Sequence, residues 1–204
     1  MFTLFFYHDP MCSWCWGYRP VSDQIFANLP DNVQLVNVLG GLAPDSDEPM
    51  PQNLLEGLPK AWQRIHEMLG TEFNFDFWTK CKPRRSTYPA CRAVLAAGKQ
   101  NHYDEMVDAI QRAYYLRAMN PSDLDTLELL AKELGLDAGN FAIDIRSSEV
   151  DVALRSQVQL AKDSPIDGYP SLAMEIDGQL VPITRDYKDS KATLDHIRRL
   201  ISES

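Results

Sequence analysis

The chain has 204 residues, of which 45% are hydrophobic and 24% are charged, and its formal net charge is −9. This length suits one large domain, or one domain with an insertion, and the acidic charge argues against nucleic acid or an anionic membrane as a partner. No run approaches the ~20 apolar residues of a membrane-spanning helix. No basic leader with a cleavage site precedes the first apolar run, so we expect a cytoplasmic protein without a membrane partner.

The N-terminal part predicts a β-α-β unit. Residues 2–7 are apolar or aromatic and predict a buried strand, and residues 12–28 predict a helix that Pro20 kinks. Residues 33–39 are rich in Val and Leu, so we expect a second strand that is buried on both faces and ends at Gly40-Gly41.

The middle of the chain predicts helices. Residues 43–51 are rich in Pro, Asp and Ser and predict a linker. Ser148, with Asp151 three residues later, resembles a capping box that opens the last helix of the block. Apolar residues recur at helical spacing in three stripes. The stripes are Tyr103, Met106, Val107, Ile110 and Tyr114; Leu124, Leu127, Leu130, Ala131 and Leu134; and Val150, Leu154, Val158 and Ala161.

The C-terminal part predicts a hairpin and a helix. Residues 171–176 and 179–184 have strand patterns, and Asp177-Gly178 between them is a hairpin turn signal. A final helix begins at Asp189 or Ser190. The whole order is therefore β-α-β, a long helical block, then α-β-β-α, which is a thioredoxin arrangement with a helical insertion.

The motif that carries chemistry is Cys12-Ser13-Trp14-Cys15, at the start of the first predicted helix. Unpaired N–H groups and the positive end of the helix dipole favour a thiolate there. We therefore predict that Cys12 is an exposed nucleophile, and that Cys15 is a more buried resolving thiol with a higher pKa. Ser13 and Trp14 lie between them and tune the thiolate.

Gly168-Tyr169-Pro170 precedes the third predicted strand. An X-Pro bond at such a position is a candidate cis bond, and a trans turn proline is the alternative. In the arrangement above this loop faces the two cysteines. The backbone of Tyr169 would then offer hydrogen bonds to a bound peptide or thiol.

These features resemble the thioredoxin superfamily, and the helical insertion resembles its DsbA-like branch. Residues 8–17 and 85–93 look like the FrnE-like, DsbA-related predicted disulfide isomerases, and the resemblance covers essentially the whole chain. It implies an α/β thioredoxin fold. Residues 1–48 and 164–204 would form the thioredoxin-like domain, and residues 49–163 the inserted all-helical domain.

The resemblance implies thiol–disulfide exchange, as an oxidoreductase or protein disulfide isomerase, on protein or small-molecule disulfides. Cys12 and Cys15 would be catalytic. No bound cofactor and no metal is expected, and glutathione or a partner dithiol would recycle the enzyme. The direction of electron flow and the oligomeric state stay open. The residues that would contact the substrate are Ser13, Trp14, Tyr169 and Pro170.

Two other classes of function also stay open. Kappa-type glutathione transferases and hydroxychromene-carboxylate isomerases resemble this chain in architecture but typically have serine at the nucleophile position, which disfavours them here. A non-catalytic chaperone or metal-binding module is the second alternative. Aromatic residues in the insertion predict core packing, and some could line a groove for apolar substrates. They are Trp62, Phe73, Phe75, Phe77 and Trp78.

The sequence predicts a role for each of four more residues, and each role has an alternative. Asp9 is predicted to cap the active-site helix, with a proton relay to the resolving thiol as the alternative. His8 is predicted to be a packed loop residue, and a charged His8 could instead stabilise a thiolate. Cys81 and Cys91 are predicted to be buried free thiols; a second disulfide, or a zinc site shared with the motif cysteines, are the alternatives.

Overall fold

The computed structural model describes residues 1–203, which form one four-stranded mixed sheet and nine helices. The strand order is β2-β1-β3-β4. Strand β1 (Phe2–His8) is parallel to β2 (Val33–Leu39) and antiparallel to β3 (Ser171–Ile176), and β3 pairs with β4 (Gln179–Ile183). The predicted α/β thioredoxin arrangement is therefore confirmed.

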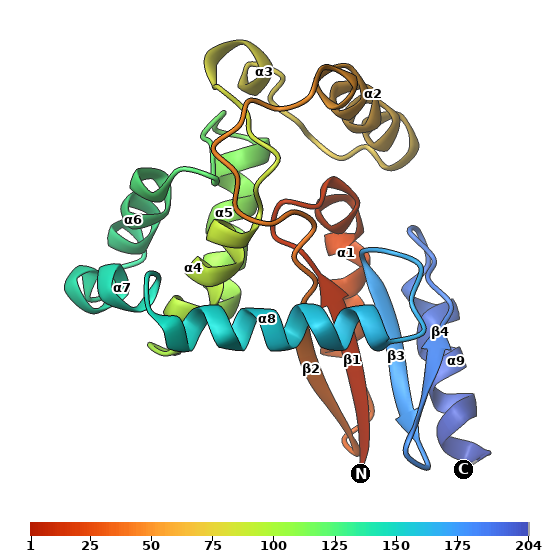
Figure 1. Ribbon diagram of the computed structural model, residues 1–204. Helices are drawn as coiled ribbons and strands as arrows, with labels where there is room; N and C mark the ends of the chain where they lie inside the picture. Colours follow the sequence, from red (N-terminus) through yellow and green to blue (C-terminus); the bar gives the residue numbers. More distant parts are fainter. Residues whose placement is uncertain (204) are drawn as a thin grey trace.

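Helices cover both faces of the sheet (Figure 1). Helices α1 (Ser13–Ala27) and α9 (Ser190–Ser202) pack on one face. Helix α8 (Ser148–Asp163) lies across the other face, where Ala161 packs with residues of the sheet. Because side chains alternate along a strand, successive residues of β1 serve both cores. Leu4 and Phe6 face α1, and Tyr7 faces α8.

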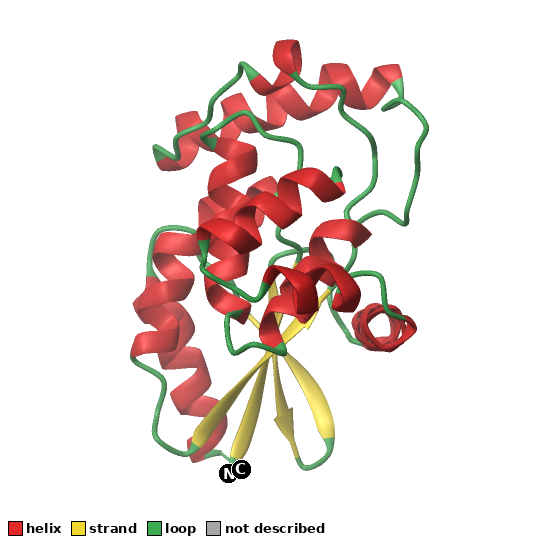
Figure 2. Cartoon of the chain, turned by 90° about the vertical axis from the view of Figure 1, so that its left-hand side faces the viewer, coloured by secondary structure: helices red, strands yellow, loops and turns green. Residues whose placement is uncertain are grey.

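The predicted helical insertion, residues 49–163, contains α2 to α8, of which α2 to α7 stand above one end of the sheet (Figure 2). Helix α4 is its centre and contacts α5, α6, α7 and α8. Small side chains on α4, including fully buried Ala90, Ala93, Ala96 and Ala97, allow this close approach. The bounds are α2 Gln52–Leu69, α3 Phe77–Lys80, α4 Tyr88–Gly98, α5 Tyr103–Tyr115, α6 Leu124–Glu133 and α7 Ala138–Asp144.

Helix α8 connects the sheet to the rest of the insertion, since it contacts both β2 and α4. Its predicted apolar stripe, from Val150 to Ala161, is buried as expected. The predicted cap was wrong by one residue, because Ser147 and not Ser148 accepts the hydrogen bond from the Val150 N–H, at 3.2 Å.

The prediction that β2 is buried on both faces was also wrong. Only Val38 and Leu39 are buried, whereas the other residues of β2 are partly or largely exposed. Strand β2 lies at the edge of the sheet, so one of its sides has no neighbouring strand. Within residues 1–203, no helix is both long enough and apolar enough to cross a membrane.

Candidate active site

The two motif cysteines lie where β1 ends and α1 begins, at the end of the sheet that faces the insertion (Figure 1). Cys12 is the N-cap residue of α1. Its N–H donates to the Asp9 carbonyl at 3.0 Å, and its own carbonyl accepts from the Trp16 N–H at 3.0 Å. The Cys12 side chain therefore sits at the positive end of the helix, and Cys15 lies one turn further along.

Both thiols are free and both are buried. Cys12 is 7% exposed and Cys15 is 4% exposed, so the expectation of an exposed Cys12 was wrong. The loop before β3 lies over Cys12, whose thiol donates to the Tyr169 carbonyl at 3.4 Å. The Tyr169 backbone therefore covers one side of the Cys12 sulfur.

Cys15 is the thiol that is harder to ionise. Burial raises its pKa well above the ordinary value, and the hydrogen bond and negative charge of Cys12 raise it further. This direction agrees with the prediction of a buried thiol of higher pKa. At neutral pH, Cys15 is therefore protonated.

The loop of Tyr169 and Pro170 lies next to Cys12, as the topology predicted. The Tyr169–Pro170 peptide bond is cis. The Tyr169 hydroxyl donates to the Gly40 carbonyl at 3.0 Å, which attaches the loop to the end of β2. A Cβ atom on Gly40 would lie 2.0 Å from the Tyr169 ring, so only glycine leaves room for this contact.

Ser13 and Trp14 open α1 and are partly exposed. The Trp14 ring meets Tyr187 edge to face, with centroids 5.3 Å apart. The Arg64 guanidinium of α2 lies over the same ring, 6.0 Å from its centroid. Trp14 therefore joins the insertion to the segment before α9, beside Cys12.

Asp9 is fully buried and does not cap α1, so that prediction was wrong. It precedes the N-cap by three residues, and its carboxylate turns toward the insertion instead. Three donors approach it at 2.7–2.8 Å: the N–H groups of Met11 and Leu42 and the hydroxyl of Thr87. Burial raises the pKa of Asp9, and these hydrogen bonds oppose that shift.

The segment that supplies Thr87 is the start of α4, within residues 85–93. The Cys91 thiol donates to the same Asp9 oxygen at 3.6 Å. Burial raises the pKa of Cys91 well above its ordinary value, and the nearby Asp9 charge adds to this. Cys91 is thus a buried free thiol, as predicted. Cys81 is also free but only half-buried, and it donates to the Ala118 carbonyl at 3.0 Å.

His8 is the last residue of β1 and is 3% exposed. Its Nε2 atom shares a 3.1 Å hydrogen bond with the Tyr103 hydroxyl, and its ring stacks on Phe6. Burial lowers the pKa of His8 to about 4. His8 is therefore neutral at pH 7 and carries no charge with which to stabilise a thiolate.

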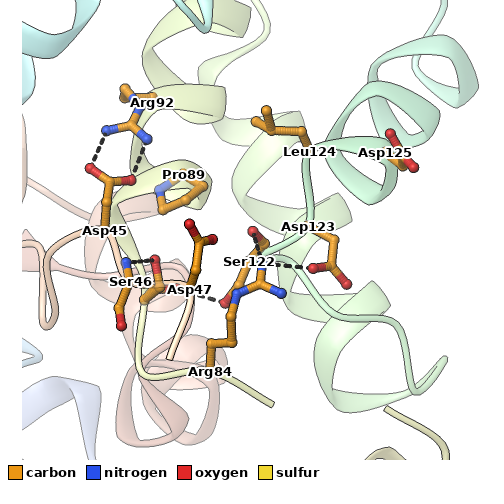
Figure 3. A pocket seen from close by; sticks show the side chains of 11 residues that line it. Asp45, Ser46, Asp47, Arg84, Pro89, Arg92, Ser122, Asp123, Leu124 and Asp125 are labelled. Atoms are coloured by element: carbon orange, nitrogen blue, oxygen red, sulfur yellow. Dashed lines mark hydrogen bonds and ion pairs between the residues drawn. The ribbon is translucent and has the colours of Figure 1, made fainter. Parts of the chain in front are cut away.

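One cavity is lined by some of these groups, and a second is separate from them. One of about 360 Å³ lies between α1, the sheet and α5, and both Cys15 and His8 line it. The other, of about 610 Å³, lies between the linker after β2 and the insertion, where Arg92 pairs with Asp45 and Arg84 pairs with Asp123 (Figure 3). Its lining holds no cysteine, so it is separate from the thiol pair. Among residues 1–203, no three His, Cys, Asp or Glu side chains gather as metal ligands.

The prediction that the aromatic residues of the insertion pack as a core is confirmed in part: Phe73 and Trp78 are partly buried, whereas Phe75 is 40% exposed. Trp62 and Phe77 are each 1% exposed, and Tyr115 is fully buried among them. The Tyr115 ring stacks on Trp16, the residue after Cys15, with centroids 5.7 Å apart. Sequence reasoning missed Tyr115 and gave Thr87 no role, since neither pattern nor spacing indicates which side chains of the insertion meet the motif.

The comparisons with known proteins agree with this geometry. The family model of the DSBA-like thioredoxin domain matches residues 3–194. A candidate protein disulfide isomerase from Nitrosomonas europaea is 26% identical, with a TM-score of 0.85 over 99% of this chain and 98% of that chain. The cytosolic disulfide reductase DsbM from Pseudomonas aeruginosa, also solved with GSH, is 23% identical, with a TM-score of 0.75 over 98% of this chain and 97% of that chain.

Among curated proteins, the chain is similar to the ClpXP adapter protein SpxH of Halalkalibacterium halodurans. The two are 23% identical over 194 residues, which is 88% of this chain and 61% of SpxH. The chain thus spans less than two thirds of the length of this relative.

Proposed function

Because the chain belongs to the DSBA-like thioredoxin domain family, a family of thiol–disulfide oxidoreductases, we propose that it exchanges disulfides through Cys12 and Cys15. Cys12 is the nucleophile and Cys15 the resolving thiol. The observation that carries this proposal is the placement of Cys12 at the helix N-terminus, 3.4 Å from the Tyr169 carbonyl. The helix end favours a thiolate, and the adjacent loop offers backbone groups to a substrate.

The reaction proceeds in two exchanges. The Cys12 thiolate attacks one sulfur of a substrate disulfide, and the other sulfur leaves as a thiolate that takes a proton from water. Cys15 then loses its proton to water and attacks Cys12. The Cys12–Cys15 disulfide forms as the mixed disulfide breaks, so two electrons pass from the protein dithiol to the substrate.

The order of the steps follows from burial and charge. Cys15 is protonated at neutral pH, so it does not compete with Cys12 for the substrate. A mixed disulfide removes the negative charge from Cys12, and that charge is one of the causes that raise the pKa of Cys15. Cys15 therefore becomes a better nucleophile only after Cys12 has reacted.

The substrate lies along the Tyr169–Pro170 loop. An extended peptide can accept and donate strand-like hydrogen bonds along this loop. Pro170 has no backbone N–H, so it cannot donate a hydrogen bond to the Cys12 thiolate. Ser13 and Trp14 form the other side of the site. Asp9 orders the loop before Cys12 and His8 packs beneath it.

We place this reaction in the reducing direction, in the cytoplasm, with glutathione as the recycling thiol. Cytosolic thiols are kept reduced, so disulfides formed there are removed or rearranged rather than donated. Two glutathione molecules would reduce the Cys12–Cys15 disulfide and leave as glutathione disulfide. The protein needs no bound cofactor for this cycle.

The reduction potential of the Cys12–Cys15 pair tests the proposal. The protein is equilibrated in glutathione buffers, alkylated and mapped by mass spectrometry, with Cys12→Ser and Cys15→Ser variants as controls. A potential of about −270 mV supports a reductase, and one of about −120 mV would mean a disulfide donor. Absence of any Cys12–Cys15 disulfide would refute the redox function. Glutathione turnover that survives Cys15→Ala would favour a transferase instead.

Similarity to SpxH supports a second candidate, a binding role that needs no redox chemistry. A Cys12→Ser, Cys15→Ser double variant separates the two functions. The binding role holds if the double variant loses all activity toward disulfides but still suppresses the aggregation of an unfolded protein. It also holds if the double variant still delivers a partner protein to ClpXP.

A further inference from the structure

Arg185 follows the end of β4 and binds the loop that carries Tyr169. Its guanidinium donates to the Pro170 carbonyl, to the Ser171 hydroxyl oxygen at 2.7 Å and to the Asp167 carboxylate at 2.7 Å. These three acceptors come from both ends of the loop, before and after Tyr169. Because an arginine presents its N–H donors in one rigid plane, a single side chain holds all three acceptors together.

The loop is thereby fixed with one carbonyl turned toward the motif. The Ser171 hydroxyl, which accepts from Arg185, donates in turn to the Gly168 carbonyl at 2.6 Å. None of these bonds uses the Tyr169 carbonyl, which accepts from the Cys12 thiol at 3.4 Å. The bonds of Arg185 therefore hold the backbone on either side of the carbonyl that lies against Cys12.

The backbone around Arg185 is itself held in place. The Asp186 carboxylate accepts from the N–H groups two and three residues further along the chain, at 2.8 and 2.9 Å. The Thr184 carbonyl accepts from the hydroxyl of Thr193, in α9, at 3.1 Å. Arg185 thus extends from a segment that is anchored to the start of α9.

The same segment contacts the helix that carries the cysteines. The Tyr187 ring meets the rings of Trp14 and Tyr18 edge to face, with centroids 5.3 and 5.1 Å apart. Arg185 therefore binds the loop on one side of Cys12, and Tyr187 packs on α1 on the other side. The Arg185 side chain is only 24% exposed, so its hydrogen bonds are largely shielded from water.

We propose that Arg185 is a positioning residue for disulfide exchange, which holds the Tyr169 backbone beside Cys12 for the peptide groups of a substrate. This assignment rests on the proposed function. Arg185 touches neither thiol and acts through the loop. It therefore favours disulfides that carry peptide groups, such as glutathione disulfide, because those groups pair with backbone N–H and C=O groups. A disulfide without peptide groups gains nothing from the fixed loop.

The test compares two disulfides as oxidants of the reduced protein. Reduced protein is mixed with glutathione disulfide or with bis(2-hydroxyethyl) disulfide, quenched with acid and mapped by mass spectrometry. For Arg185→Gln we expect oxidation by glutathione disulfide to be about tenfold slower, and oxidation by the hydroxyethyl disulfide to stay within about twofold of wild type. A purely structural role would slow both reactions equally.

Arg84→Gln is the matched control. The Arg84 side chain is 23% exposed, pairs with Asp123 at 2.7 Å and donates to the Ser122 carbonyl at 2.7 Å, but it lines the cavity that is separate from the thiol pair. It should leave both rates unchanged. Arg185→Lys, which keeps the charge but not the planar fork, replaces Arg185→Gln if that variant does not fold, and the same difference between the two disulfides is expected.

Hydrogen–deuterium exchange of residues 167–171 reports on the loop without any turnover. We expect exchange about tenfold faster in Arg185→Gln and unchanged in Arg84→Gln. Unchanged exchange in Arg185→Gln, or equal rates of oxidation relative to wild type for the two disulfides, would overturn the assignment. If neither disulfide oxidises the wild-type protein, the proposed function fails, and the exchange rates still decide whether Arg185 holds the loop.

Discussion

The carboxylate of Asp9 accepts a 2.7 Å hydrogen bond from the hydroxyl of Thr87, which is 78 residues later in the chain. Thr87 precedes α4, so this bond joins the loop before Cys12 to the centre of the insertion. The Thr87 hydroxyl also lies 3.1 Å from the Ala43 N–H, from which it accepts. One side chain therefore holds together the loop before the motif, the linker after β2 and the insertion.

Replacing Thr87 should destabilise the fold. Thr87→Val keeps the shape but leaves the buried Asp9 carboxylate without one of its donors. We expect a loss of about 1–3 kcal/mol in the free energy of unfolding, measured by urea denaturation. Thr87→Ser, which keeps the hydroxyl, is the control. Equal losses in the two variants would show that the methyl group matters and the hydrogen bond does not.

Gly40→Ala should impair the site without unfolding the sheet. The new methyl group would lie 2.0 Å from the Tyr169 ring, so the Tyr169–Pro170 loop must shift away from Cys12. We expect kcat/KM for disulfide reduction to fall about tenfold or more, measured with glutathione disulfide.

Gly57→Ala in α2 is the matched control for that change. Nothing lies within 4 Å of a Cβ atom there, so alanine should raise stability by about 0.5–1 kcal/mol and leave activity unchanged. Unaltered activity in Gly40→Ala would contradict the role of the Tyr169 loop.

His8 should make stability fall in mild acid. Its folded pKa is about 4, below the 6.5 of the unfolded chain, so only the unfolded state binds a proton between these values. The stability that the neutral, buried His8 contributes is fully present above pH 6.5 and is lost as the pH falls toward 4. It amounts to about 3 kcal/mol at most.

The difference in stability between wild type and His8→Gln isolates the contribution of His8, because the other groups that titrate in this pH range are present in both proteins. Asp9, with its raised pKa, contributes with the opposite sign, since the folded state there binds the proton more readily. Urea denaturation at intervals from pH 7 to pH 4 should show a steeper loss for wild type. Parallel curves would mean that His8 is accessible to protons in the folded state.

In the folded protein, the cysteines should react with an alkylating agent at different rates. Cys91 is fully buried with a raised pKa, so it should stay unlabelled at pH 7. Cys81 is more exposed than Cys12, but burial raises its pKa, so it should react slowly. Cys12 should react first, because it lies at the positive end of α1, which favours a thiolate. Mass mapping after timed quenching checks this order. Labelling in guanidinium chloride, where all four thiols must react, is the control; native labelling of Cys91 as fast as Cys81 would contradict the burial.

Local patterns predicted most elements of the fold. Val33–Leu39 and Ser171–Ile176 are strands with the predicted bounds, because strand periodicity and flanking turn residues act over a few neighbours. The wrong predictions concern the surroundings of an element: which faces its neighbours cover and which residue caps it. The exposure of β2 depends on its edge position, and the cap at Ser147 depends on a single hydrogen bond.

The sequence by itself determined that two thiols stand at a strand-to-helix junction, and that a proline loop precedes a hairpin of the same sheet. Those features depend on spacing along the chain. Only the tertiary structure decided that Cys12 is buried, that Asp9 turns to Thr87 rather than to α1, and that Tyr115 lies beside the motif. These contacts join residues far apart in sequence, and their geometry follows from how the insertion packs on the sheet, which no local pattern encodes.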